Sequence, residues 1–478
     1  MSNAAQSLAS ARIHSLLDAN SFVEIGGGVT ARNTDFNLAD TDTPSDGVIT
    51  GYGVISGKLV YVYSQDVSVL NGTVGEMHAK KITNLYDLAM KTGAPIIGLL
   101  DCGGVRLQEA TDALHGLGQI YHRQAMASGV IPQITGVFGA CGGGMALFPA
   151  LSDFTFMVQD AGKLFVNAPN ALDGNHVSKC DTADAKFQSE ETGLVDGVGT
   201  EEEILECIQR LVTFLPSNNE DDLPYQPCED DLNRSCPGLE DCAGNAAIVL
   251  ARIGDNRAFM ETKAAYGKDV VTGFMRLNGS TVGCVANRRV ICDEEGKVVE
   301  DFGGVLSARG AKKAADLVKF CDAFHIPVLT LTDVAGFKAT KCSEKHMAKA
   351  VGGLTYAFAN ATVPKVNVIV GKAYGSAYVA MNSKSIGADM VYAWSIAEVG
   401  AMEASMAAKI MYPEADADTW KVKTVEYQAL QSNVLSAARR GYVDLVIEPK
   451  DTRKHVIGAF EMLYTKREGR PDKKHGTV

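Results

Sequence analysis

A chain of 478 residues is too long to fold around one hydrophobic core, so we expect two or three domains. Hydrophobic residues make up 46% of it, and 48 glycines stand against only 14 prolines, which is typical of a globular enzyme and argues against disorder. The formal net charge of −12 argues against nucleic-acid binding, which requires a basic surface.

The placement of apolar residues and cysteines excludes further classes of protein. No apolar run approaches the roughly eighteen residues that a membrane-spanning helix needs. Residues 1–10 lack the basic segment and apolar run of a secretory signal. The 11 cysteines are odd in number and show no Cys-x-x-Cys spacing, so we expect reduced thiols, no metal site in this chain and a cytoplasmic protein.

The first half of the chain alternates between helix and strand patterns. A short helix is expected over residues 11–17, and apolar alternation around Ser56 and Gly57 predicts a hairpin. Helix spacing then marks 74–92, and an unbroken apolar run predicts a buried strand over 95–101. A helix over 112–128 and a strand over 131–138 follow, so the pattern is that of an α/β protein.

An acidic stretch with several prolines and no periodicity runs from Pro216 to Cys242 and predicts a linker. We therefore expect a first domain over 1–225, a linker over 226–242 and a second domain over 243–478. After the linker the same order returns. The predicted elements are a hairpin over 274–283, a helix over 308–323, and strands over 327–331 and 363–370.

The two halves repeat one motif at a constant offset. Asp333 lies 232 positions after Asp101, and the same offset relates Gly336 to Gly104 and Gly371 to Gly139. Two copies of one supersecondary unit predict two copies of one kind of site.

In each half a strand leads into a glycine-rich turn and then a helix. N–H groups in the first turn of a helix have no partner within the helix, and the helix dipole adds positive charge. An oxyanion over Gly143 and Gly144, or over Ser376 and Ala377, would meet such donors, as in an oxyanion hole. The alternative is that the glycines only permit tight turns.

Other catalytic motifs are not supported. The glycine turns lack a Gly-Lys-Ser/Thr ending, the dinucleotide spacing and the Gly-x-Ser-x-Gly elbow. The nine histidines show no metal-like spacing, and only His78 and His115 fall near the expected first site. The segment Arg106–Glu109 either orients the first turn or is a solvated helix start. Methionines of the second half are interpreted as core packing: Met381, Met390, Met402, Met406 and Met411.

Several longer strings resemble one family. In the first half they include Val60-Tyr-Val-Tyr-Ser-Gln-Asp66, Gly103-Gly-Val-Arg-Leu-Gln-Glu109 and Ala127-Ser-Gly-Val-Ile-Pro-Gln133. In the second they include Phe320-Cys-Asp-Ala-Phe-His-Ile-Pro327, Lys372-Ala-Tyr-Gly375 and Arg440-Gly-Tyr-Val-Asp444. From about residue 11 to 461 the chain resembles carboxyltransferase subunits of biotin-dependent acyl-CoA carboxylases and decarboxylases, of the propionyl-CoA carboxylase beta and methylmalonyl-CoA decarboxylase alpha kind.

The resemblance implies two tandem crotonase-like ββα superhelix domains. The first would bind the thioester oxygen of an acyl-CoA, and the second the ureido oxygen of biotin, so that enolate and ureido anions are each held by backbone N–H groups. Matching the family's motifs gives Gly143 and Gly144 for the first hole, Ser376 and Ala377 for the second. Further substrate-binding candidates are Gly103, Gly104, Ala335, Gly336 and Val379.

The resemblance also implies partners. The chain has no Ala-Met-Lys-Met type of biotinyl-lysine motif, so biotin would arrive on a separate biotin carboxyl carrier protein. A biotin carboxylase or membrane decarboxylase subunits would complete the system. The chain itself would form a homo-oligomer, from dimer to hexamer, with the active site between the first half of one subunit and the second half of its partner.

Some family positions differ in this chain. The second hole is usually Tyr-Gly-Gly-Ala but here reads Tyr374-Gly-Ser-Ala377, and the usual Met-Gly-Pro-Glu-Gly is replaced by Met402-Glu-Ala-Ser-Met406. The acyl group, propionyl or acetyl, is left open. Two alternatives keep the fold: the transferase of a sodium-pumping decarboxylase, or a catalytically silent assembly subunit. A crotonase-type hydratase or hydrolase is disfavoured, because we find no side chain suited as its acid or base.

Overall fold

The chain folds into two compact units. The structure, a computed structural model, describes residues 7–33, 36, 38, 41–293 and 295–473. The first unit ends at Pro224 and the second begins at Tyr225. Of the segment searched above for a secretory signal, residues 1–6 lie outside the described residues.

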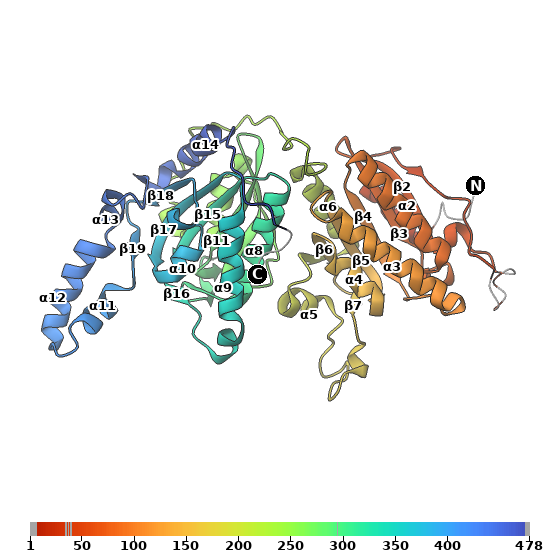
Figure 1. The fold of residues 1–478 in the computed structure, drawn as a ribbon, viewed down its shortest axis with the longest axis horizontal. Helices are drawn as coiled ribbons and strands as arrows, with labels where there is room; N and C mark the ends of the chain where they lie inside the picture. Colours follow the sequence, from red (N-terminus) through yellow and green to blue (C-terminus); the bar gives the residue numbers. More distant parts are fainter. Residues whose placement is uncertain (1–6, 34–35, 37, 39–40, 294, 474–478) are drawn as a thin grey trace. The chain divides into compact units, whose positions relative to one another are not determined.

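The first unit is built on a mixed sheet with the strand order β1-β2-β3-β4-β5-β6-β8, and β7 joins β5 (Figure 1). The strands are β1 (Val23–Glu24), β2 (Val48–Ile55), β3 (Lys58–Gln65), β4 (Ile96–Cys102), β5 (Gln133–Gly142), β6 (Phe154–Val158), β7 (Lys163–Phe165) and β8 (Gly197–Gly199). The hairpin predicted around Ser56 and Gly57 is confirmed as β2 and β3, which pair antiparallel. From β3 onward the neighbouring strands are parallel.

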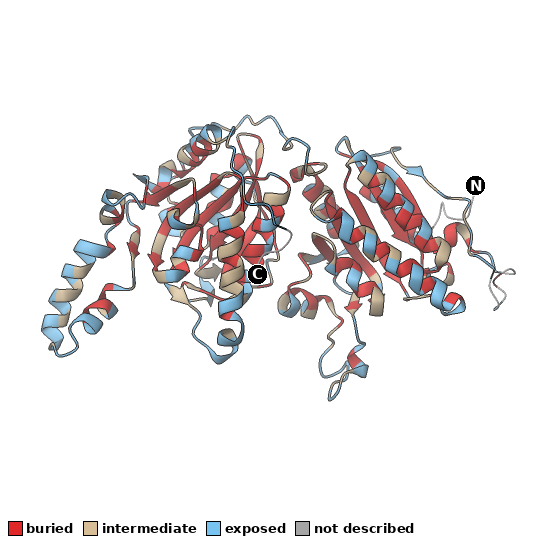
Figure 2. Cartoon of the chain, in the orientation of Figure 1, coloured by how far each residue is buried: buried red, intermediate tan, exposed pale blue. Residues whose placement is uncertain are grey.

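Helices cover both faces of this sheet. They are α1 (Leu8–Leu16), α2 (Glu76–Thr92), α3 (Ala110–Ala127), α4 (Leu147–Ala150), α5 (Ala185–Phe187) and α6 (Glu201–Phe214). One core lies between the sheet and helices α2 and α3, and it includes Val137 of β5. The next residue, Phe138, points to the opposite face, as strand geometry requires, and there Arg12 of α1 lies 4.8 Å from its ring centroid. Figure 2 shows the strands buried and the outer helix faces exposed.

The second unit repeats this arrangement. Its sheet has the order β9-β10-β11-β15-β17-β18-β20, and β19 joins β17. The strands of this sheet are β9 (Met260–Thr262), β10 (Val270–Leu277), β11 (Ser280–Asn287), β15 (Val328–Val334), β17 (Lys365–Tyr374), β18 (Met390–Trp394), β19 (Glu398–Gly400) and β20 (Leu445–Ile447). Two small pairs join β12 (Val290–Cys292) to β13 (Val298–Asp301) and β14 (Val305–Leu306) to β16 (Gly336–Phe337).

The second unit has helices of its own, of which only some have counterparts in the first unit. They are α7 (Ala246–Ile253), α8 (Ala308–Ala323), α9 (Lys341–Asn360), α10 (Gly375–Ala380), α11 (Ala404–Met411), α12 (Ala417–Tyr427), α13 (Val434–Arg439) and α14 (Thr452–Met462). Helix α8 has the predicted bounds. Helices α11 and α12 project from the unit as an arm (Figure 1). The expected core role of the methionines is wrong for Met406 and Met411, which lie on this arm and are each 56% exposed.

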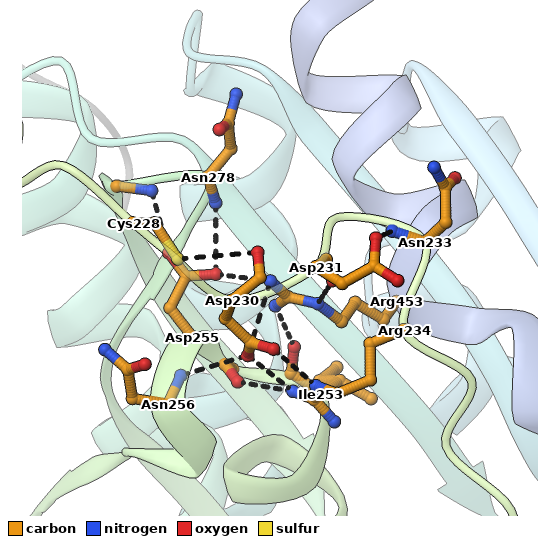
Figure 3. Close-up of polar contacts among 12 residues, drawn as sticks. Cys228, Asp230, Asp231, Asn233, Arg234, Ile253, Asp255, Asn256, Asn278 and Arg453 are labelled. Atoms are coloured by element: carbon orange, nitrogen blue, oxygen red, sulfur yellow. Dashed lines mark hydrogen bonds and ion pairs between the residues drawn. The ribbon is translucent and has the colours of Figure 1, made fainter.

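Residues 226–242, expected to be a linker, lie within the second unit. Figure 3 shows how a buried arginine of α14, Arg453, ties them down: it donates to Asp231 O at 3.2 Å and to Asp255 Oδ1 at 2.7 Å. Asp230 accepts both guanidinium arms of Arg234, at 2.8 and 3.0 Å. One acidic residue of this segment, Asp230, therefore neutralises buried or half-buried arginines.

The described residues lack two kinds of feature. No helix among them is long and apolar enough to cross a membrane. No group of three or more His, Cys, Asp and Glu side chains in the described ranges could hold a metal ion.

Candidate functional site

In the first unit, the two predicted glycine turns lie side by side. Strands β4 and β5 are parallel neighbours, and Cys102 pairs with Cys141 at their carboxyl ends. The turn after β4, Gly103 and Gly104, therefore lies beside the turn after β5, where Gly143 opens the short 3-10 helix η6 (Gly143–Ala146). The register thus brings together all four candidates of the first half.

The four glycines use their N–H groups differently. Gly103 N donates to Asn71 O at 2.9 Å, and Gly104 N donates to the Cys102 Sγ at 3.3 Å. The N–H groups of Gly143 and Gly144 stand in the first turn of η6, where the helix offers them no acceptor. The N–H groups of Gly103 and Gly104 are therefore already engaged, whereas those of Gly143 and Gly144 have no acceptor within the helix.

The first site is open because the glycines there have no side chains. Gly143 has a φ of +61°, and neither it nor Gly104 would bring a Cβ within 4 Å of another atom. Gly142 is filled instead by the ring of Phe165 on β7. On the helix side, the Tyr121 hydroxyl donates to Gly144 O at 2.5 Å and fixes the turn. The open backbone at Gly104 and Gly143 allows a ligand oxygen to approach closely.

The second unit carries the equivalent turn at the end of β17. Val334 of β15 pairs with Ala373 of β17, which sets Ala335 and Gly336 beside the start of α10. The N–H groups of Ser376 and Ala377 lie in the first turn of that helix, without acceptors inside it. Val379 follows within α10 and is 38% exposed.

One further residue of the second turn was not among the candidates. Gly375 has a φ of +60° and stands 232 positions after Gly143, which has a φ of +61°. Ser376 is consequently the equivalent of Gly144, and Ala377 of Met145. The constant offset was the signal that would have identified Gly375.

One aromatic ring lies beside each turn, but the ring belongs to β7 in the first unit and to β17 in the second. In the first unit, Gly142 faces Phe165 across β5 and β7. In the second, Tyr374 faces Gly400 across β17 and β19, so the large and small residues have exchanged places. The Tyr374 hydroxyl forms a hydrogen bond with Glu398, and burial raises the pKa of this phenol. The aromatic ring beside the second turn is therefore polar, whereas the ring beside the first turn is apolar.

Each turn lies next to a buried aspartate that forms an ion pair with an arginine. Asp101 pairs with Arg12 at 3.0 Å, and Asp333 pairs with Arg289 at 2.9 Å. A Cβ at Gly139 or Gly371 would collide with the respective aspartate. The repeated Asp and Gly of the sequence motif are thus structural neighbours in both units.

Polar side chains in the part of the chain around the first site differ in burial. His78 is fully buried between Gln65 and Asp46, and burial with the nearby Arg106 charge lowers its pKa to about 3. His115 is exposed and contacts Gln119 on the same helix. Burial raises the pKa of the Cys102 thiol to about 11, so the thiol is neutral at pH 7. Arg106 is 1% exposed and so is not itself solvated, whereas Leu107 of the same segment is 83% exposed.

Comparison with known proteins gives consistent results. The family model described as carboxyl transferase domain matches residues 2–478. The chain is 41% identical to methylmalonyl-CoA decarboxylase subunit alpha of Propionigenium modestum and 41% identical to the propionyl-CoA carboxylase beta chain of Roseobacter denitrificans. Each alignment covers 98% of this chain and 92% of the relative.

A solved structure matches over the same length. Transcarboxylase 12S, crystallised with hydrolysed methylmalonyl-coenzyme A and described as a hexamer, superimposes with a TM-score of 0.93 at 36% identity. The match covers 99% of this chain and 92% of that one. The prediction of an α/β fold with two crotonase-like domains is confirmed.

Proposed function

Because this chain belongs to the carboxyl transferase family, it is a carboxyltransferase of the biotin-dependent acyl-CoA carboxylases and decarboxylases, and we propose that its two turns hold the two reacting groups. One observation carries the proposal. Gly143 and Gly375 occupy equivalent positions at the ends of β5 and β17, with φ values of +61° and +60°. A duplicated oxyanion hole fits a transfer that passes through two anions.

We assign the acyl-CoA thioester to the first unit. The N–H groups of Gly143 and Gly144 would bind the thioester oxygen and stabilise the negative charge that it carries as an enolate. The apolar Phe165 ring beside Gly142 suits an acyl chain better than a charged group. Gly104, with open space above it, would let the thioester lie against the backbone.

The residues of the second turn fit the ureido oxygen of carrier-bound biotin. Ser376 is exposed, and a Cβ at Gly336 would meet nothing within 4 Å, which supports approach of an oxygen atom to the Ser376 N–H, with the buried Ala377 next to it. When bound, biotin supplies the carboxyl group that is moved and an anion that can accept the substrate's α-proton. The chain then has to hold charge, not to exchange protons through a side chain.

The relatives leave the direction of carboxyl transfer open and suggest partner proteins. A decarboxylase subunit and a carboxylase chain are equally similar to this chain, so carboxylation and decarboxylation are both open. We propose a biotin carboxyl carrier protein as partner, with either a biotin carboxylase or membrane decarboxylase subunits, in a homo-oligomer between dimer and hexamer. We retain the cytoplasm as its location, which the eleven unpaired cysteines favour.

Carboxyl exchange tests the proposal directly. The purified chain is mixed with biotinylated carrier and a panel of malonyl-CoA and methylmalonyl-CoA, and carboxyl transfer to labelled acetyl-CoA or propionyl-CoA is followed. We expect CoA-dependent exchange with at least one pair. Binding of CoA esters without exchange would instead identify a silent assembly subunit, and neither binding nor exchange would reject the proposal.

A further inference from the structure

The turn at Gly103 and Gly104 rests on a clamp segment, residues 71–74. Asn71 O accepts from Gly103 N, Gly104 O accepts from Val74 N, and Val74 O accepts from Arg106 N, each at 2.9 Å. The place of the turn therefore depends on the place of this segment. The second unit has the same bridge, since Leu306 pairs with Phe337 just as Val74 pairs with Val105.

In the first unit, a buried charged cluster holds the clamp segment. Arg106 donates through Nη2 to Thr73 O at 2.8 Å and through Nη1 to Asp46 Oδ1 at 2.5 Å and Glu109 Oε1 at 2.8 Å. The side chains of Arg106, Asp46 and Glu109 are at most 1% exposed. Lys338, at the position equivalent to Arg106, is exposed and its backbone N bonds to Leu306 O.

Hydrogen bonds connect the cluster to helix α2 and to the end of strand β4. Glu109 Oε2 accepts from Glu76 N at 2.5 Å, at the start of α2, and Asp46 Oδ2 accepts from His78 N at 2.7 Å. The His78 ring contacts Gln65 at 3.2 Å, and Gln65 Oε1 accepts from Asp101 N at 3.2 Å. A continuous polar path thus surrounds the turn from the end of β4 to the start of α2.

Strained backbone gathers at the same place. Asp46, Asn71 and Ala110 have positive φ values of 48°, 53° and 43° although none is glycine. At the position equivalent to Asn71 the second unit has Gly303, which adopts φ +67° without strain. Such strain persists only where the surroundings over-determine the conformation, and it gathers at functional sites.

We propose that Arg106 is a positioning residue for carboxyl transfer, which fixes the clamp segment and so keeps Gly103 and Gly104 in register with the Gly143 N–H. The proposal rests on the proposed function of the first site. A turn that drifts away would still admit the thioester, but the thioester oxygen would no longer lie along the donors. Misplacement of this kind lowers the rate of the chemical step more than it weakens binding.

The test compares R106K with R32K. Lysine keeps the charge at position 106 but cannot reach Thr73 O and both carboxylates together. Arg32 is a matched control, because it pairs with Glu76 of α2 and Asp112 of α3 but its side chain is 44% exposed. Below the melting temperature of each variant, we expect R106K to lower kcat at least about tenfold and to change KM for methylmalonyl-CoA less than about twofold. R32K should match the unaltered chain.

Other outcomes decide against the proposal. Unchanged kcat in R106K would overturn it, and so would a parallel loss of kcat, binding and thermal stability, which marks a purely structural role. Should R106K fail to fold, E109Q takes its place, with the same split of kcat from KM expected. If the unaltered chain shows no transfer, the proposed function fails, and amide hydrogen exchange at positions 103 and 106 tests the positioning of the turn separately: faster exchange in R106K than in R32K supports it, and equal exchange overturns it.

Discussion

At the scale of single residues, the proposed function distinguishes glycines that would donate an N–H group from glycines that would only make room. Gly143 needs a φ of +61°, and the adjoining space is open. G143P forces φ to about −65° and removes the N–H, so we expect carboxyl exchange to fall by at least about 100-fold. G143A keeps the N–H and meets no atom within 4 Å, so it should cost about 1 kcal/mol of stability and keep most activity.

A matched control for G143P is G118A. Gly118 lies on the exposed face of α3, where a Cβ meets no atom within 4 Å, and alanine there should raise stability by about 0.5–1 kcal/mol with unchanged exchange. Exchange is measured with the biotinylated carrier and stability by urea unfolding. Full activity in G143P would remove Gly143 from the site.

Ser376 tests whether a side chain takes part in the second hole. The residue is exposed in the first turn of α10, and its proposed contribution is the backbone N–H. We therefore expect S376G to keep exchange within about threefold, because the donor survives the change. A loss of more than about tenfold, with an unchanged melting temperature, would show that the hydroxyl contacts biotin.

Residue-scale prediction from sequence succeeded where the repeat supplied a second copy. Asp101 and Asp333 do occupy matching places, and the offset also locates Gly375. Sequence did not reveal that Gly103 N is already engaged by Asn71 O, because that bond joins residues 32 positions apart in a loop without periodicity. Nor did it reveal the burial of Arg106, since an Arg-Leu-Gln-Glu string also fits a solvated helix start.

At the scale of elements, the repeat also duplicates a buried lysine. Lys81 of α2 donates to Ser45 O and Val48 O, and 232 positions later Lys313 of α8 donates to Lys263 O and Tyr266 O. Each lysine thus anchors a helix to the segment that precedes the hairpin. Burial, the main cause, lowers the pKa of Lys81 to about 8 and that of Lys313 to about 7.

This lysine makes stability depend on pH in a defined direction. Between pH 7 and 10.5 the folded chain has released the Lys313 proton while the unfolded chain still holds it. The unfolded state binds more protons, so the free energy of unfolding rises with pH in this window. We expect K313M to reduce that slope by up to about 1.4 kcal/mol per pH unit in urea titrations, whereas K312M, the exposed neighbour, should leave it unchanged. Equal slopes in all three proteins would contradict this linkage.

Strand ends were the least predictable elements. The strand expected over 131–138 continues as β5 to Gly142, and the one expected over 363–370 continues as β17 to Tyr374. In both cases a second partner strand takes over the pairing, β7 at Ala140–Gly142 and β19 at Lys372–Tyr374. The residues at these strand ends have no alternating apolar pattern from which a strand could be predicted. The strand ends are stabilised by pairing with the partner strand and not by their own side chains.

At the scale of the whole molecule, sequence predicted two homologous units and their order but not the arm of α11 and α12. Helix α12 buries none of its residues, although Val422 and Val425 are spaced like one apolar helix face. Several large apolar side chains of the arm and the segment after it are exposed: Met406, Ile410, Met411, Val422, Val425 and Leu430. A pattern of this kind predicts a buried face, and within the single chain nothing covers it in the described residues.

An exposed apolar surface of this extent is typical of a protein interface. We expect the arm to pack against a second copy of the chain, in keeping with the homo-oligomer proposed above. Ile410 and Val425 are 64% and 67% exposed, so aspartates there should leave each unit folded but place charges in the interface. Sedimentation velocity of I410D/V425D should then show a smaller assembly than that of the unaltered chain. V299D, on the 62% exposed Val299 of β13, is the control and should leave the assembly unchanged. If the arm variant sediments like this control, the arm is not the surface through which copies associate.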